Sequence, residues 1–403
     1  MDRAEAMAQL QAAGANENDA DRALDQAVIR SPRSARAGRS RVMWSESSGF
    51  TVMSLVTAEI TPSALHAELP HALAVTAAVP GLLGFHPSSS LVFAGQTADR
   101  RPGVTLRYDL PDPLDPELAS DMAIHAAAAL TGNRMPVVTV VGFGSETLVV
   151  APAVIAGQRL ATAGLQVAGL LRVRGGRYWC LCGAPGCEHG RPLPEQEPAA
   201  AVAGRPALPS RSALAATIAP LSGPEADTAG LAVQAAERAA AAGGRRQAER
   251  RGYTVAREAI ARYRDGRPIT DPAAIAELLV SLRFTAVRDL AWSLMDPSHA
   301  AAHERLWTDL TRRAPARCRP APASLLAFTA WQRGNGALAN VALDLALDAD
   351  RRYSMAQLLH SALAAGAPPS LARLPLTPEQ VTAAHESGPN QRAHAEPTEL
   401  DGP

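Results

Sequence analysis

One short run of the sequence brings together three thiols and an imidazole. Its potential ligands are, in order, Cys180, Cys182, Cys187 and His189. Thiolate sulfur and imidazole nitrogen are the usual ligands of tetrahedral structural Zn²⁺ sites, and Pro185 with Gly186 allows a sharp turn between them. The spacing differs from the regular cysteine pairs of most zinc knuckles. The run predicts a zinc site of three cysteines and one histidine; the alternatives are a Cys182–Cys187 redox pair and small buried thiols without a chemical role.

A second group that could do chemistry lies in a Gly-Phe-His-Pro turn, just before a predicted strand. His86 in this turn is a candidate acid–base residue, because loop residues beside strands often act in catalysis. Its structural alternative is to cap backbone groups that Pro87 leaves irregular. Asp109 is the candidate partner, provided that the two strand ends converge. Arg107 lies two residues before Asp109 on the same strand face, so an ion pair between them is the simpler expectation.

The basic residues of the chain are all arginine, 39 of them against 39 acidic residues, with no lysine. The absence of lysine excludes a Schiff base, a Walker-type phosphate-binding lysine and a lysine general base. Gly142 and Gly144 resemble the start of a dinucleotide-binding loop, but Thr147 stands at the third glycine position. No acidic residue follows between Glu146 and Glu188 to hold a ribose hydroxyl. No nucleotide cofactor is therefore predicted.

Arginines recur at helical spacing along a tract over 226–263. The candidates for contact with phosphate groups are Arg245, Arg246, Arg250 and Arg251. The alternative is a solvated helix face on which glutamates such as Glu249 form pairs with arginines three or four residues away. Because the charges of the whole chain balance, nothing draws it to nucleic acid overall.

Helix and strand patterns alternate along the first half of the chain. Apolar spacing predicts helices over about 64–85, 115–130 and 146–163, the first broken at Pro70 and ended near Pro80. Strands are predicted over 91–95, 104–110 and 137–144, and a strand pair over 166–181 turns at Gly175 and Gly176. This order is typical of an α/β domain with a mixed sheet.

Strand signals nearly vanish beyond residue 210, where the patterns predict a mostly α-helical domain. Helices are expected from Ser210 or Ser212 to 221, over 226–263 with an interruption at Gly243 and Gly244, from the N-cap Asp271 to about 294, and around 306–310. Near the end, Gly334, Ala339, Leu343 and Ala346 have the spacing of a tetratricopeptide hairpin. Because a stable stack needs about three repeats, such a hairpin is expected to form core rather than a peptide groove.

These patterns divide the chain into five parts. The predicted parts are a mobile extension (1–54), an α/β domain (55–190), a Pro/Ala-rich linker (191–209), a helical domain (210–375) and a disordered tail (376–403). The N-terminus has no apolar core of a signal peptide, and no apolar stretch approaches the ~18 residues needed to span a bilayer. The expected location is the cytoplasm, without membrane association.

Several phrases of the sequence occur together in one known family. They are LLGFHPSSSLVF (82–93), VTLRYDLP (104–111), RYWCLCGAPGCEHGRPL (177–193), LPSRSALAA (208–216), LWTDLTRRAP (306–315) and AWQRGNGALANVALDLAL (330–347). By these phrases the chain resembles the actinobacterial domain of unknown function catalogued under number 4192, over about 64–370. The resemblance implies a bacterial cytoplasmic protein and carries over no catalytic residue. It also implies a cysteine where this chain has Glu188.

The function that these observations predict is a protein-binding or scaffold role, with an unknown protein partner and a structural zinc loop, rather than an enzyme. The first alternative is an enzyme of unknown class in which His86, Asp109 and the cysteine loop converge at one edge of the sheet. The second alternative is a nucleic-acid-associated protein that binds through its arginine-rich tract.

Overall fold

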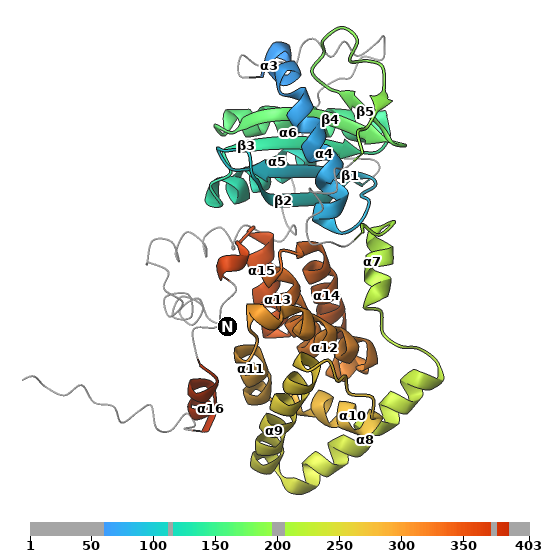
Figure 1. Ribbon diagram of the computed structural model, residues 1–403, viewed down its shortest axis with the longest axis vertical. Helices are drawn as coiled ribbons and strands as arrows, with labels where there is room; N and C mark the ends of the chain where they lie inside the picture. Colours follow the sequence, from blue (N-terminus) through green and yellow to red (C-terminus); the bar gives the residue numbers. More distant parts are fainter. Residues whose placement is uncertain (1–59, 112–115, 196–205, 372–376, 387–403) are drawn as a thin grey trace, which may run out of the picture. The chain divides into compact units, whose positions relative to one another are not determined.

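The computed structural model describes residues 60–111, 116–195, 206–371 and 377–386, which form two compact units (Figure 1). The sheet unit ends at Leu214 and also includes the short segment Ser361–Pro368. The helical unit comprises Ala215–His360 and the chain from Pro369 onward. The chain thus consists of an N-terminal α/β unit with a mixed sheet, followed by a mostly helical unit, as the sequence predicted. No helix within the described ranges has both the length and the apolarity to cross a lipid bilayer.

The sheet unit is built on a mixed sheet with strand order β2-β1-β3-β4-β5-β6. The strands are β1 (Ser90–Gln96), β2 (Pro102–Asp109), β3 (Val137–Phe143), β4 (Gln166–Arg174), β5 (Arg177–Cys180) and β6 (Arg191–Pro192). β3 and β4 are parallel, and the other neighbours are antiparallel. The central strands β1 and β3 are buried along their whole length. Their continuous runs of apolar residues are what a strand covered on both faces requires.

Helices cover both faces of this sheet: α3 (Pro62–Ala67), α4 (Leu69–Leu83), α5 (Pro116–Gly132) and α6 (Glu146–Thr162). A Cβ on Gly142 of β3 would lie 2.7 Å from Val149 of α6, and one on Gly169 of β4 would lie 2.5 Å from Ala72 of α4. Gly169 pairs with Thr139, which is three residues from Gly142 and so faces the other side of the sheet. α4 therefore packs on one face and α6 on the other (Figure 1).

The first helical stretch differs from the expectation that it would end near Pro80. Pro70 lies in the first turn of α4 and separates this helix from α3, as predicted, but α4 continues through Pro80 to Leu83. Buried Val79 and Leu83 hold this last turn against the core. The helix ends where Gly84 adopts a left-handed conformation with φ of 76°.

The helical unit contains, in chain order, α8 (Pro224–Gly243), α9 (Arg245–Arg264), α10 (Pro272–Ser281), α11 (Thr285–Ser293), α12 (Ala300–Arg313), α13 (Pro320–Gln332), α14 (Gly336–Ala349) and α16 (Pro378–Glu386). α7 (Arg211–Thr217) and α15 (Ser354–Ala364) each cross a boundary between the two units. Short 3₁₀ helices cover Pro297–His299, Ala316–Cys318 and Pro369–Leu371. The predicted break at Gly244 and the N-cap Asp271, whose side chain accepts a bond from the Ala273 amide, are both confirmed.

Two stretches of the helical unit differ from the expectation. The single helix predicted from 271 to 294 is two helices, because the backbone of Phe284 is extended and begins α11 anew. No glycine or proline marks this break. In the tail, where disorder was expected, α16 forms with Pro378 in its first turn and Val381 only 2% exposed, packed beside α11. The predicted extension 1–54 and residues 196–205 of the predicted linker lie outside the described ranges.

α13 and α14 form a helical hairpin through a tight turn. Gly334 has φ of 73°, and the Asn335 side chain accepts a bond from the Leu338 amide at the start of α14. Nearly all of α13 is buried, which matches the core-forming role expected of this hairpin. Its likeness to a tetratricopeptide unit stays a prediction.

Candidate metal centre

The cysteines begin at Cys180, the last residue of β5, and the pairing of β5 with β4 fixes the face of the sheet to which Cys180 points. Cys180 is opposite Leu171, and Leu171 is two residues from Gly169, so these side chains face the side of the sheet that carries α4. Cys182, two residues after Cys180, follows on that side. The short helix α3 packs on β4. Strand alternation and helix packing thus bring α3 to the cysteine loop.

The loop after β5 is shaped by turns and closed by β6. Cys187 donates its backbone N–H to the carbonyl of Ala184 at 3.1 Å. Pro185 follows Ala184, and Gly186 has φ of 83°, which is the pattern of a type II turn. The sharp turn expected at these two residues is therefore present. Pairing of β5 with β6 then closes the loop at its base.

A stacked side-chain pair supports the loop from the other face of the sheet. The guanidinium of Arg172 lies over the Trp179 ring, 3.8 Å from its centroid. Gly190 passes over the same indole so closely that a Cβ there would lie 2.4 Å from the ring. Arg177 donates to the carbonyl of Gly190, and Arg191 donates to that of Gly186 at 3.4 Å. The loop is therefore held by contacts that do not involve its thiols.

Three potential metal ligands meet at this loop. The ligand atoms of His66, Cys182 and Cys187 all lie within 4.8 Å of one another. The two sulfurs are 3.4 Å apart, with Cys182 1% and Cys187 8% exposed, whereas His66 is exposed. Cys180 is also buried and lies beside Cys182. This His/Cys cluster could hold a metal ion.

The electrostatics of the cluster favour neutral thiols unless a cation is present. Burial raises the pKa of Cys180, and hydrogen bonding to Cys182 raises it further. Burial and the contact with Cys182 also raise the pKa of Cys187. A divalent metal ion reverses this balance, because a coordinated thiol is deprotonated. Sulfur with imidazole nitrogen is a donor set that suits zinc and other borderline-soft metals.

The histidine of this cluster is not the one that the sequence suggested. His189 has a side chain 83% exposed, with its Nε2 3.8 Å from a carboxylate oxygen of Glu188. His66 lies close to the thiols instead. Nothing local in the sequence indicates His66, because only the packing of α3 on β4 brings it to residues so distant along the chain. The resemblance phrases also begin after this residue.

The acid–base candidates lie elsewhere on the sheet. His86 is exposed and precedes β1, while β3 and β4 separate β1 from β5, a distance of roughly 14 Å across the sheet. Along the strands, β1 begins at the end of the sheet where β5 begins, and the cysteines follow the opposite end of β5. Asp109 forms the expected ion pair with Arg107. The strand order therefore does not bring these groups and the cysteine loop to one edge.

The arginine-rich tract is partly neutralised by acidic partners. Arg245 pairs with Glu249 at 2.9 Å, as helical spacing predicted, and Arg251 pairs with Glu277 of α10 at 2.6 Å. Arg246 and Arg250 are exposed on α9. The tract thus combines structural ion pairs with two exposed guanidinium groups one helical turn apart.

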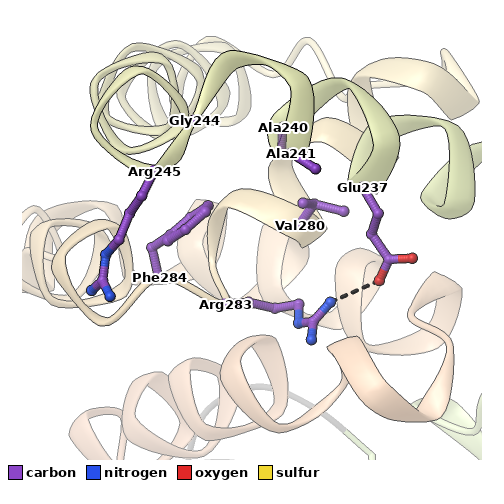
Figure 2. A pocket seen from close by; sticks show the side chains of 8 residues that line it. All are labelled: Glu237, Ala240, Ala241, Gly244, Arg245, Val280, Arg283 and Phe284. Carbon is purple, nitrogen blue, oxygen red and sulfur yellow. Dashed lines mark hydrogen bonds and ion pairs between the residues drawn. The ribbon is translucent and has the colours of Figure 1, made fainter.

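A groove of about 510 Å³ lies where α8 meets α9 (Figure 2). Its lining residues are Glu237, Ala240, Ala241, Gly244, Arg245, Val280, Arg283 and Phe284. Glu237 accepts a hydrogen bond from Arg283 at 2.7 Å in this groove, and it also binds Arg317. The hydrogen bond from Arg317 lowers the pKa of Glu237, followed by the charges of both arginines. The charged side chains of this groove pair with acidic or basic neighbours, so the groove resembles packing between helices more than a reaction site.

A comparison with known protein families assigns the chain to one of them. Residues 70–370 match the family described as a domain of unknown function (DUF4192), and the chain belongs to this family. The matched residues include the three cysteines but not His66. No curated protein and no solved structure with which the chain was compared matches it.

Proposed function

We propose that the protein is a zinc-stabilised scaffold in which His66, Cys182 and Cys187 bind Zn²⁺ and Cys180 completes the tetrahedron. The observation that carries this proposal is the approach of three ligand atoms, from two distant segments, to within 4.8 Å. The donor set, thiol sulfur with an imidazole nitrogen, suits a divalent ion such as zinc at this point. His189 is the alternative fourth ligand that the sequence suggested.

A structural role for the ion fits the surroundings better than a catalytic one. Structural zinc sites are closed by four protein ligands, whereas catalytic sites keep a position open to water. Three of the four proposed ligands are buried, and the loop that carries them is closed by β6. The nearest acid–base candidates lie across the sheet. The ion would therefore join α3 to the sheet edge rather than activate a substrate.

Metal content of purified protein tests this proposal. The full chain, prepared with reductant and zinc and then dialysed, should contain close to one equivalent of zinc by elemental analysis. A variant with Cys182→Ser and Cys187→Ser should contain little, whereas Cys318→Ala, which removes a buried thiol of the helical unit, should retain the ion. Less than about a tenth of an equivalent in the unmodified protein contradicts a tight structural site.

The scaffold role is proposed for the cytoplasm, with an unidentified protein as partner. Exposed surface along α8, where Leu231 is 66% exposed and only Val233 is buried, supports a surface that contacts another protein. The free cysteines of the described chain suit a reducing compartment. Affinity capture from the native host should enrich a partner with the unmodified chain and lose it with Leu231→Glu. Repeated captures that recover no enriched protein contradict this role.

A second proposal is association with nucleic acid through α9. Its support is the exposure of Arg246 and Arg250, which lie four residues apart on one helix face. Binding of double-stranded DNA should weaken with salt and weaken further in a variant with Arg246→Ala and Arg250→Ala. Equal binding by this variant would exclude α9 as the contact.

A further inference from the structure

The helix that carries His66 is weakly held by its own contacts. α3 has six residues, and Leu65, 3% exposed, is its buried side chain. Thr61 caps the helix by accepting a bond from the Ala64 amide at 3.3 Å. Helices this short are not stable alone in water, so tertiary contacts must hold them. α3 therefore depends on whatever fixes it to the sheet.

The residue after α3 is fixed independently. Glu68 ends α3 and precedes α4, and its carboxylate binds Arg100 at 2.7 Å. Leu69 begins the long helix α4 and is buried. The chain from Glu68 onward is thus anchored without the cysteine loop. A change in how α3 is held would end at Glu68 and leave α4 in place.

His66 connects this short helix to the buried thiols. Its imidazole lies within 4.8 Å of the Cys182 and Cys187 sulfurs, and it is the exposed member of the group. The other members belong to one loop, which the β5–β6 pairing and the stacked Trp179 hold. A bond from the metal to His66 is therefore the one that crosses from the loop to α3.

We propose that metal occupancy regulates the docking of α3, so that Pro62–Ala67 is held on the sheet when zinc is bound and released when zinc is removed. This inference rests on the proposed zinc site. With the ion in place, the His66–metal bond and buried Leu65 hold the helix together. Without the ion, the helix keeps only the burial of Leu65 and of the preceding Ile60 together with the Thr61 cap, and the face of β4 beneath α3 becomes accessible. The protein then responds to available zinc through one short element.

Amide hydrogen exchange on the full, reduced chain tests this inference. Peptides that cover Pro62–Ala67 should exchange at least about tenfold more slowly with zinc than after treatment with a chelator. Peptides of α5, on the other face of the sheet, should be unchanged and serve as the internal control. His66→Gln should remove the zinc effect on α3, and because His66 is exposed, this variant keeps the fold. His189→Gln is the matched control and should behave as the unmodified chain.

The outcomes separate the two proposals. A chain that binds one zinc but shows equal exchange of α3 with and without it overturns the docking inference and leaves the zinc site standing. The docking inference is also overturned if His189→Gln loses the zinc effect on α3 exchange and His66→Gln keeps it. A chain that binds no zinc overturns both proposals. Protection of α3 that needs both zinc and His66 supports them together.

Discussion

The cysteine loop of the sheet unit and the arginine-rich helices of the helical unit both concentrate polar side chains, yet they arrange them differently. At the loop, His66 and the thiols of Cys182 and Cys187 meet in one small volume. Along α8 and α9, several charged groups pair with opposite charges: Glu237 of α8 binds two arginines, and Arg251 of α9 binds Glu277 of α10. In these pairs of the helical unit, opposite charges neutralise one another. At the loop, burial raises the pKa of Cys180 and Cys187, and the neighbouring Cys182 raises it further.

This difference shows how a ligand site can be told from a structural network. Paired opposite charges leave nothing for a ligand to neutralise, and exposed pairs contribute only about 0–1 kcal/mol each. Clustered thiols gain from a cation, because its attraction for each thiolate outweighs the repulsion between the thiolates. Substitutions in the two regions should therefore act on different measurements, metal content in one and modest stability in the other.

The largest effect is expected at the loop. Replacing Cys182 by serine should lower zinc affinity by roughly two orders of magnitude or more, since structural zinc sites of four ligands release about 10–16 kcal/mol on binding. Competition with a chromophoric chelator measures this change. Cys318→Ala, in the helical unit, should leave the affinity as it is. An affinity unchanged by Cys182→Ser would show that Cys182 does not bind the ion.

The helical unit should instead respond to acid through His303. This buried histidine accepts a bond from the Asp296 amide at 3.4 Å, and burial lowers its pKa to about 4, with the charge of Arg264 adding to the effect. Unfolded histidine titrates near 6.5, so the unfolded chain takes up the proton first. Stability is complete above about pH 6.5 and is lost as pH falls toward 4, by up to about 3 kcal/mol.

Urea unfolding followed by tryptophan fluorescence checks this dependence, because Trp292, Trp307 and Trp331 belong to the helical unit. The control is His303→Gln, which cannot be protonated in this range and should flatten the profile between pH 4 and 6.5. An equally steep profile in this variant would assign the acid sensitivity to other groups.

A smaller effect is expected where the loop crosses Trp179. Gly190→Ala places a Cβ 2.4 Å from the Trp179 indole, on which the guanidinium of Arg172 is also stacked. Displacement of the loop should cost about 1–3 kcal/mol of stability and weaken zinc binding by about tenfold. Thermal unfolding with and without zinc separates the two quantities. Gly164→Ala at a turn with open space around it is the control for the added methyl group, although its φ of 83° adds local strain.

The smallest effect is expected in the arginine network. Glu237→Gln weakens both ion pairs to Arg283 and Arg317 and should cost about 1 kcal/mol or less, because all three side chains are partly exposed. Because the pKa of Glu237 is lowered in the folded protein, its contribution to stability is present above the pKa of an unfolded glutamate and is lost as pH falls. Zinc content should not change. A loss of zinc in this variant would show that the arginine network and the cysteine loop are coupled.

The fold was more predictable from the sequence than the site was. Strong local patterns located strands β1 to β5, the break at Gly244 and the cap at Asp271, because turn chemistry and apolar spacing act within a few residues. The two-residue strand β6 was missed, since it lies in the predicted linker 191–209. The division between α10 and α11 escaped prediction, since no glycine or proline marks it. Helix α16 escaped as well, because a polar segment gains its order from burying Val381.

The site was predictable only in part, because part of it also depends on tertiary packing rather than on local sequence. Three cysteines within one loop are visible in the sequence, and so is the turn at Pro185 and Gly186. His66 is not visible there, because its approach depends on sheet pairing and on the face to which α3 packs. Proximity along the chain favoured His189 as the histidine ligand, but the structure places that side chain in solvent.

X-ray absorption at the zinc edge of the loaded full chain is the most direct test of the proposed centre. We expect three sulfur ligands near 2.3 Å and one imidazole nitrogen near 2.0 Å. The nitrogen signal should be lost in His66→Gln and kept in His189→Gln. Retention of the imidazole in His66→Gln, or a shell composed only of oxygen and nitrogen, would contradict the assignment.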